Sequence, residues 1–177
     1  MTLEKIILLN GERIKSLQCP VQSLARKLCE DCKNKLNVVL YITSTLRTLE
    51  EQAQLYANGR TTFSFRGVVY KSKTLEIVTR ARPGKSWHNY GVAFDVVPCY
   101  NNSNDYVPEW NHPNWLSIGK IGKDIGLEWG GDWTNFPDRP HFQLTNSLAL
   151  STAYANVILD NKQLIMHSIG EGYEFIA

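Results

Sequence analysis

An acidic residue in the middle of an apolar segment is the feature that most constrains the fold of this chain. The segment Val92–Val97 reads VAFDVV, and its alternation predicts a β-strand in which Asp95 shares a face with Ala93. Burial of an unpaired carboxylate is costly, so Asp95 requires an arginine, a metal ion or an outward-facing position. The outward-facing alternative stays open because one face of an antiparallel strand can be solvated.

The other periodic segments predict helices and short strands around this one. Val21–Lys35 has helical spacing, and Thr48 followed by Glu51 is a capping box that begins a helix ending near Asn58. We predict further strands at 37–43, 127–129 and 141–144, a helix at 114–125, a short hairpin at 68–77 within a loop at 60–85, and a loop at 100–113. The predicted fold class is α+β, with a small antiparallel sheet flanked by helices.

Length and composition favour one domain and exclude two classes of partner. A chain of 177 residues with 43% hydrophobic residues can build one core, so we expect a single domain over residues 1–177, and a monomer. The net charge of +2 gives no basic field suited to nucleic acid. No apolar run approaches the roughly 18 residues that a membrane helix needs, and the first ten residues lack a signal-peptide pattern.

The four cysteines include a single C-x-x-C pair, formed by Cys29 and Cys32. A structural zinc site needs four ligands at matched spacing, so one pair is a weak metal signal. Both residues fall in the helix predicted at Val21–Lys35, where a free cysteine packs as a small hydrophobic residue. We therefore expect reduced thiols on a helix.

Two histidines and the strand carboxylate form a candidate zinc site. Zinc in a hydrolase is typically held by three protein ligands, with one position left for water. His88, Asp95 and His141 supply such a set, although either histidine taken alone is more often a structural residue. Asp138 lies three residues before His141 and can reach a bound water without being a ligand.

Three motifs carry a resemblance to a known family. They are SWHNYGVAFD over Ser86–Asp95, EWGGDW with DRPHFQ over Glu128–Gln143, and TSTLRTLEEQ over Thr43–Gln52. Together they resemble the M15 metallopeptidases, and within that family the L-alanyl-D-glutamate endopeptidases of phage endolysins and autolytic enzymes. The resemblance covers about residues 10–144. It implies the zinc DD-peptidase (hedgehog-like) fold.

The resemblance also implies a role for each of seven residues. Zn²⁺ is held by His88, Asp95 and His141, the catalytic residues are Asp138 and Arg47, and the substrate-binding residues are Gln52 and Ser86. The alternatives are an ordinary ion pair for Arg47, a solvated helix surface for Gln52 and a turn position for Ser86.

The implied activity is hydrolysis of the L-alanyl-D-glutamate bond in the peptidoglycan stem peptide. A chain without a signal sequence or a separate wall-binding domain fits a phage or prophage endolysin that is made in the cytoplasm and released to the wall by a separate pore. The alternatives are a D,D- or L,D-carboxypeptidase and a non-catalytic zinc-stabilised wall-binding module, and motif spacing does not distinguish among them. The packing of the tail, residues 145–177, stays open.

Overall fold

The computed structural model describes residues 1–103, 105–144, 165–169 and 172–176, in two compact units, Met1–Thr145 and Asn146–Ala177. The helices are α1 (Leu3–Ile14), α2 (Cys19–Leu36), α3 (Leu49–Ala57) and α4 (Trp115–Asp124), with 3₁₀ turns η1 (Trp87–Tyr90) and η2 (Gly130–Asp132). The strands of the first unit are β1 (Val39–Ser44), β2 (Thr62–Phe65), β3 (Val68–Lys71), β4 (Ala93–Asn102), β5 (Asp105–Pro108), β6 (Glu128–Trp129) and β7 (His141–Gln143). In the second unit β8 (Ile165–Ile169) and β9 (Gly172–Ile176) pair antiparallel, and the rest of the tail lies outside the described residues.

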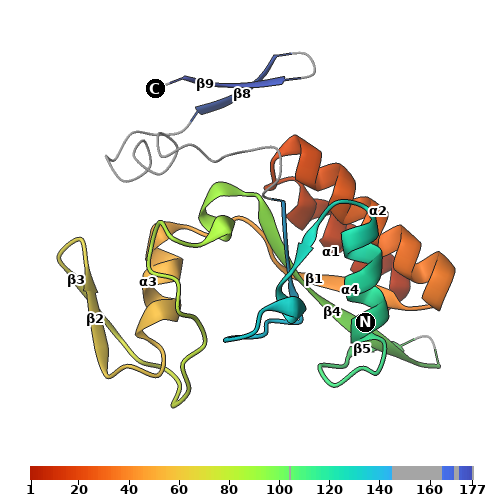
Figure 1. Ribbon diagram of the computed structural model, residues 1–177, viewed down its shortest axis with the longest axis horizontal. Coiled ribbons are helices and arrows are strands. Elements are labelled where there is room, and N and C mark those ends of the chain that lie inside the picture. Colours follow the sequence, from red (N-terminus) through yellow and green to blue (C-terminus); the bar gives the residue numbers. More distant parts are fainter. Residues whose placement is uncertain (104, 145–164, 170–171, 177) are drawn as a thin grey trace. The chain divides into compact units, whose positions relative to one another are not determined.

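A five-stranded antiparallel sheet organises the first unit. Its strand order is β1-β4-β7-β6, and β5 pairs with the far part of β4. Helices α1, α2 and α4 gather on one side of the sheet, and α3 lies on the other side with the hairpin β2–β3 (Figure 1). The predicted α+β class is confirmed. Among the described residues, no helix is long and apolar enough to cross a membrane.

Aromatic residues form the core face of the central strands. Phe94 on β4 and Phe142 on β7 are fully buried, with stacked rings whose centroids are 5.9 Å apart, and Trp129 on β6 stacks on Phe142 at 6.5 Å. Burial of one such side chain contributes about 1.5–3 kcal/mol. Because successive strand residues point to opposite faces, this core fixes the neighbouring residues of β4 and β7 on the other face. Those neighbours include Asp95 and His141.

The register of the sheet places Asp95 between two polar residues. On one side Asp95 is opposite Ser44 of β1, and on the other it is opposite His141 of β7. The pairing of β1 with β4 is irregular between Ile42 and Ser44, where β1 contains one extra residue, Thr43. A bulge of this kind re-aims side chains next to functional sites. Here it brings Ser44 opposite the carboxylate.

The first helix, α1, was not predicted from the sequence. Thr2 caps it, and its buried positions are Ile6, Asn10 and Ile14, one per turn. The buried asparagine interrupts the apolar pattern, which conceals the helix. The Nδ2 atom of Asn10 donates to the carbonyl of Leu40 at 2.8 Å, and its Oδ1 accepts from the amide of Ile42 at 2.8 Å. Asn10 therefore satisfies the open edge of β1, which would otherwise present unpaired backbone groups.

The hairpin predicted at 68–77 was placed too late in the chain. Its strands are β2 and β3, joined by Arg66 and Gly67, which have φ angles of 50° and 78°. A two-residue hairpin turn of this type requires positive φ at both positions, and arginine is an unusual residue there. The sequence signal for a hairpin at β2–β3 was weak because this turn contains arginine at its first position.

The predicted loop at 100–113 is wrong in its first part. Strand β4 continues to Asn102 and pairs with β5, with Tyr100 opposite Val107 and Asn102 opposite Asp105. The Asn-rich composition favours a loop, but pairing across the strands decides the local structure. This end of the β4–β5 pair is exposed, so its polar side chains remain in contact with solvent.

The C-x-x-C pair lies on α2 as predicted. Cys32 is fully buried and Cys29 half-buried, and all four cysteines are free. Burial raises the pKa of Cys29 and Cys32 to about 12, which keeps both thiols protonated at neutral pH. Protonated thiols are poor metal ligands, so Cys29 and Cys32 are packing residues of the helix, as expected from the sequence.

Candidate metal centre

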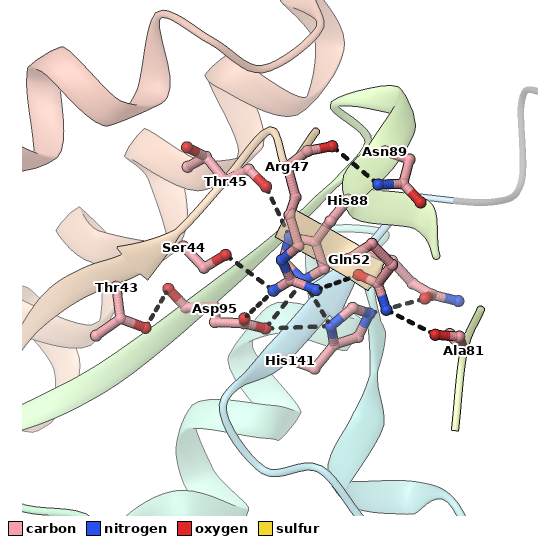
Figure 2. Close-up of polar contacts among 11 residues, drawn as sticks. Thr43, Ser44, Thr45, Arg47, Gln52, Ala81, His88, Asn89, Asp95 and His141 are labelled. Atoms are coloured by element: carbon pink, nitrogen blue, oxygen red, sulfur yellow. Dashed lines mark hydrogen bonds and ion pairs between the residues drawn. The ribbon is translucent and has the colours of Figure 1, made fainter. Parts of the chain in front are cut away.

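Three side chains from separate elements converge on one point. His88 comes from η1, Asp95 from the middle of β4 and His141 from the start of β7. The Nε2 atom of His88, the Nδ1 atom of His141 and the Oδ1 atom of Asp95 are each 3.2 Å from the other two. Figure 2 shows the two imidazoles and the carboxylate directed at one another. The structure thus brings together the three predicted ligands.

The triangle has the dimensions of one face of a zinc coordination sphere. Tetrahedral zinc binds histidine nitrogen and carboxylate oxygen at about 2.0–2.2 Å, which separates two ligand atoms by about 3.3–3.6 Å. The observed 3.2 Å edges are close to that value. Within the described residues these three form the one group of His, Cys, Asp and Glu that could hold a metal ion. The donor set suits zinc.

His88 is held by the backbone. Its Nδ1 atom lies 2.7 Å from the carbonyl oxygen of Thr45, an acceptor, so Nδ1 carries the proton and Nε2 presents a lone pair to the centre. The carbonyl of His88 accepts from the amide of Arg47 at 3.0 Å. Gly91 ends the 3₁₀ turn with φ of 66°, which lets the chain reverse into β4. The SWHNYG segment therefore orients its histidine through backbone contacts at both ends.

The charges of the centre are strongly coupled. Burial opposes ionisation of Asp95, but the neighbouring imidazoles of His88 and His141 lower its pKa below the ordinary range. Burial likewise opposes protonation of His141, but the hydrogen bond and charge of Asp95 outweigh it and raise its pKa. Burial lowers the pKa of Arg47, and the charge of Asp95 acts against that change. Asp95 is consequently an anion that needs cationic neighbours.

Arg47 contacts the second oxygen of Asp95. Its Nη2 atom is 3.4 Å from Asp95 Oδ2 and donates to Ser44 Oγ at 3.0 Å, while Nη1 donates to Gln52 Oε1 at 2.8 Å (Figure 2). Gln52 is fully buried, and its Nε2 donates to the carbonyl of Ala81 at 2.7 Å. Gln52 therefore does not lie on a solvated helix surface, nor among the residues that line the cavity of the centre. It holds the guanidinium of Arg47.

Asp138 lies beside the three donors but is not one of them. Its amide donates to the carbonyl of Gly130 at 2.9 Å, and its carbonyl accepts from the amide of His141 at 3.1 Å. A Cβ atom at Gly130 would lie 2.6 Å from the Asp138 carbonyl oxygen, so this close approach requires glycine. Burial and the nearby charge of Asp95 raise the pKa of Asp138. Within the described part of the chain, its carboxylate makes no hydrogen bond or ion pair.

The centre opens into a cavity of about 900 Å³. Its lining includes the predicted residues Arg47, Ser86, His88, Asp95, Asp138 and His141. Three cationic side chains, Arg47, Arg80 and Lys85, also line it, together with Trp87, Trp110 and Trp133. Trp129 belongs to the core instead. The cavity therefore offers a cationic and aromatic wall beside the candidate metal site.

Sequence reasoning missed four residues that support the site. Ser44 and Asn89 orient Arg47, since the Asn89 Nδ2 donates to the Arg47 carbonyl at 2.9 Å. Gln143 and Glu128 form a hydrogen-bonded chain behind His141. The alternation of β7, which places Gln143 two residues after a ligand and on the same face, could have revealed Gln143. The other three depend on tertiary contacts.

Sequence comparisons relate this centre to known peptidases. Residues 79–144 match the peptidase M15 family model described as D-alanyl-D-alanine carboxypeptidase. The chain is 38% identical over 109 residues to the peptidoglycan L-alanyl-D-glutamate endopeptidase CwlK of Bacillus subtilis, covering 58% of this chain and 59% of CwlK. It is 30% identical over 123 residues to the L-alanyl-D-glutamate peptidase of Listeria phage A118, covering 69% of this chain and 36% of that peptidase. The chain thus spans about three fifths of the length of CwlK and about one third of the length of the phage peptidase.

Solved structures share the fold. The L-Ala D-Glu endopeptidase ChiX of Serratia marcescens superposes with a TM-score of 0.51 at 23% identity, over 77% of this chain and 86% of ChiX. A variant of the vancomycin-resistance D,D-pentapeptidase VanY, in complex with Zn(II), gives a TM-score of 0.51 at 15% identity, over 82% of this chain and 79% of VanY. Residues 79–144 therefore resemble a peptidase M15 domain, and the fold expected from the sequence motifs is confirmed.

Proposed function

We propose that this chain is a zinc-dependent peptidase that hydrolyses the L-alanyl-D-glutamate bond of the peptidoglycan stem peptide. The observation that carries the proposal is the triangle of His88, Asp95 and His141 beside Asp138 in one cavity. The names of CwlK and the phage A118 peptidase support the choice of bond. The phage relative also supports release as an endolysin that acts on the wall.

The chain's own residues supply the acid–base chemistry. His88, Asp95 and His141 would hold the zinc ion, which would supply Lewis acidity and lower the pKa of a bound water toward about 7. Asp138 accepts a proton from the attacking water at its carboxylate and delivers it to the nitrogen of the leaving amine. The raised pKa of Asp138 favours the first step, because a more basic carboxylate accepts the proton of the water more readily.

Arg47 and the cationic lining support an acidic peptide substrate. The guanidinium of Arg47 is fixed by Ser44 and Gln52 and lines the cavity, where it stabilises the developing oxyanion or binds a substrate carboxylate. Arg80 and Lys85 add positive charge to the same wall. Charge of this sign suits a stem peptide that contains glutamate, and it disfavours cationic peptides.

The description of the matching family model favours a second candidate, a carboxypeptidase that removes terminal D-Ala. Mass spectrometry of purified muropeptides, digested with zinc-loaded protein and with a chelated control, distinguishes the two activities. New amino-terminal D-Glu supports the endopeptidase, and free D-Ala supports the carboxypeptidase. A zinc-loaded protein that releases neither would leave a non-catalytic wall-binding module.

Substitution of Asp138 tests the assignment of the base. Asp138→Asn should bind zinc as the wild type does and lose about 10²–10⁴-fold in activity. Asp132→Asn is the matched control, because Asp132 lies in the same segment but is exposed and paired with Lys123. An Asp138→Asn variant that retains full activity would remove this residue from the mechanism.

A further inference from the structure

A hydrogen-bonded chain runs from His141 away from the metal centre. The Nε2 atom of His141 lies 2.8 Å from Gln143 Oε1, and Gln143 Nε2 donates to Glu128 Oε2 at 2.7 Å. The sheet builds this chain directly, because His141 and Gln143 share a face of β7 and Gln143 is opposite Glu128 in the β6·β7 pair. His141 and Gln143 are buried, with 6% and 5% of their surfaces exposed.

The chemistry of the three groups gives the chain one direction. An ionised carboxylate only accepts hydrogen bonds, so Glu128 selects the NH₂ end of the Gln143 amide. The amide oxygen must then face His141, and an oxygen accepts only from a protonated Nε2. His141 is thereby held as the Nε2–H tautomer, with the lone pair of Nδ1 directed at His88 and Asp95.

The two histidines differ in what fixes them. His88 donates to the backbone carbonyl of Thr45, which can accept a hydrogen bond but cannot donate one. His141 depends on a side-chain amide, whose oxygen and nitrogen could exchange by rotation of the amide and then favour the other tautomer. Glu128 removes that freedom, which gives this half-buried carboxylate a specific task.

We propose that Glu128 and Gln143 are positioning residues that fix the tautomer and orientation of His141 for metal binding. This inference rests on the proposed function, because it assumes a metal at the His88, Asp95 and His141 triangle. Outer partners of metal-binding histidines commonly change metal affinity by about 10–100-fold. In this role both residues act through His141.

Zinc affinity measures the effect without any activity assay. Glu128→Gln replaces the carboxylate by an amide of the same shape, and Gln143→Met keeps the volume but removes the hydrogen bonds. Each should raise the zinc Kd, measured by competition with a chromophoric chelator, by about 10–100-fold. Glu12→Gln is the matched control, since Glu12 is exposed and paired only with Lys15 among the described residues; its zinc Kd should not change.

The tautomer of His141 is a readout that a purely structural role would not move. In metal-free protein with ¹⁵N-labelled histidine, at alkaline pH where the imidazole of His141 is neutral, long-range ¹H–¹⁵N spectra should show His141 protonated at Nε2 and not at Nδ1 in the wild type. Glu128→Gln should give a mixture of tautomers while circular dichroism stays unchanged. If Gln143→Met does not fold, Glu128→Gln alone still tests the positioning role. A Glu128→Gln variant with unchanged zinc Kd and an unchanged tautomer would overturn the proposal.

Failure of the inference is distinguishable from failure of the proposed function. His88→Ala removes a ligand and should abolish stoichiometric zinc binding. If wild type and His88→Ala bind zinc equally poorly, the metal centre itself is wrong. If His88→Ala loses zinc and Glu128→Gln keeps wild-type affinity, only the positioning role is wrong.

Discussion

Asp95 and His141 face each other directly across the β4·β7 pair, with the Oδ1 atom of Asp95 3.2 Å from the Nδ1 atom of His141. The pair is therefore set by sheet register, whereas His88 arrives from a 3₁₀ turn. A carboxylate and an imidazole at this distance form an ion pair whenever the imidazole is protonated. In the proposed site, the same two atoms would hold a proton at low pH and a metal ion at higher pH.

We predict that the metal-free protein is more stable at pH 5.5 than at pH 8.5. The pKa of His141 is raised on folding, so its contribution is complete below the unfolded value of about 6.5 and is lost as pH rises through the folded value. The pKa of Asp95 is lowered, so its contribution is present above the unfolded value of about 3.9 and is lost as pH falls through the folded value. Both contributions overlap in the mildly acidic range.

Calorimetric Tm values in chelator at the two pH values measure this effect. His141→Gln should flatten the difference, because it removes the group whose pKa is raised. Zinc should reverse the trend in the wild type, since its ligands must be deprotonated. A His141→Gln variant with the pH dependence of the wild type would contradict the prediction.

We predict that Gln52 acts through Arg47. Arg47→Ala should reduce kcat/KM by about 10²–10³-fold, as expected for loss of one donor to developing charge. Gln52→Leu removes the acceptor that fixes Nη1 and should cause a smaller loss. The double variant should be no worse than Arg47→Ala alone, which corresponds to a coupling energy of about 0.5–3 kcal/mol.

The control for this cycle is Gln54→Leu on the same helix, whose amide donates to the carbonyl of Lys71 at the surface. It should leave kcat/KM unchanged. Additive losses for Arg47 and Gln52 would instead favour the role first expected from the sequence, direct substrate binding by Gln52.

The three residues of the candidate metal centre were predictable because their signals are local. Asp95 stands out as an acid inside an apolar strand, and His88 and His141 lie in motifs with strong family resemblance. The residues that orient them are not local. Gln52, Ser44 and Glu128 acquire their roles from a side-chain contact, a bulge and a strand register, none of which a linear pattern encodes.

The fold errors have the same physical origin. Helices with regular apolar spacing, such as α2 and α4, were predicted close to their observed bounds. The missed helix α1 carries a polar side chain at a buried position, where Asn10 substitutes for a neighbouring strand. Strand β5 was missed because its stability comes from pairing with β4. Tertiary partners overrode local composition in both places.

We predict that Asn10→Leu destabilises the protein through the edge of β1. The substitution keeps an apolar volume in α1 but leaves the carbonyl of Leu40 and the amide of Ile42 without their partner. Each group left unsatisfied costs about 1–3 kcal/mol. Urea unfolding measures the loss, and Asn111→Ala, at an exposed loop position, should change the free energy of unfolding by less than about 0.5 kcal/mol. Equal stability of the two variants would show that Asn10 does not support the edge.

We predict opposite effects for two kinds of glycine in helices. A Cβ atom at Gly122 of α4 would lie 2.3 Å from the Phe142 ring, and one at Gly119 would lie 2.2 Å from the Trp129 ring. Gly119→Ala and Gly122→Ala should each destabilise by about 1–3 kcal/mol, because the overpacking exceeds the gain in helix propensity. Gly11→Ala in α1 meets nothing within 4 Å and should stabilise by up to about 1 kcal/mol.

The close packing at Gly122 also links the core to the metal centre. Phe142 lies between His141 and Gln143 on β7, so displacement of its ring shifts the strand that carries a ligand and that ligand's partner. Gly122→Ala should therefore weaken zinc binding, whereas Gly119→Ala, which meets Trp129 of β6, should weaken it less. Chelator competition on the folded variants measures both. Unchanged zinc affinity in a destabilised Gly122→Ala protein would show that the ring moves without β7, and that the aromatic core and the site face of the strand are independent.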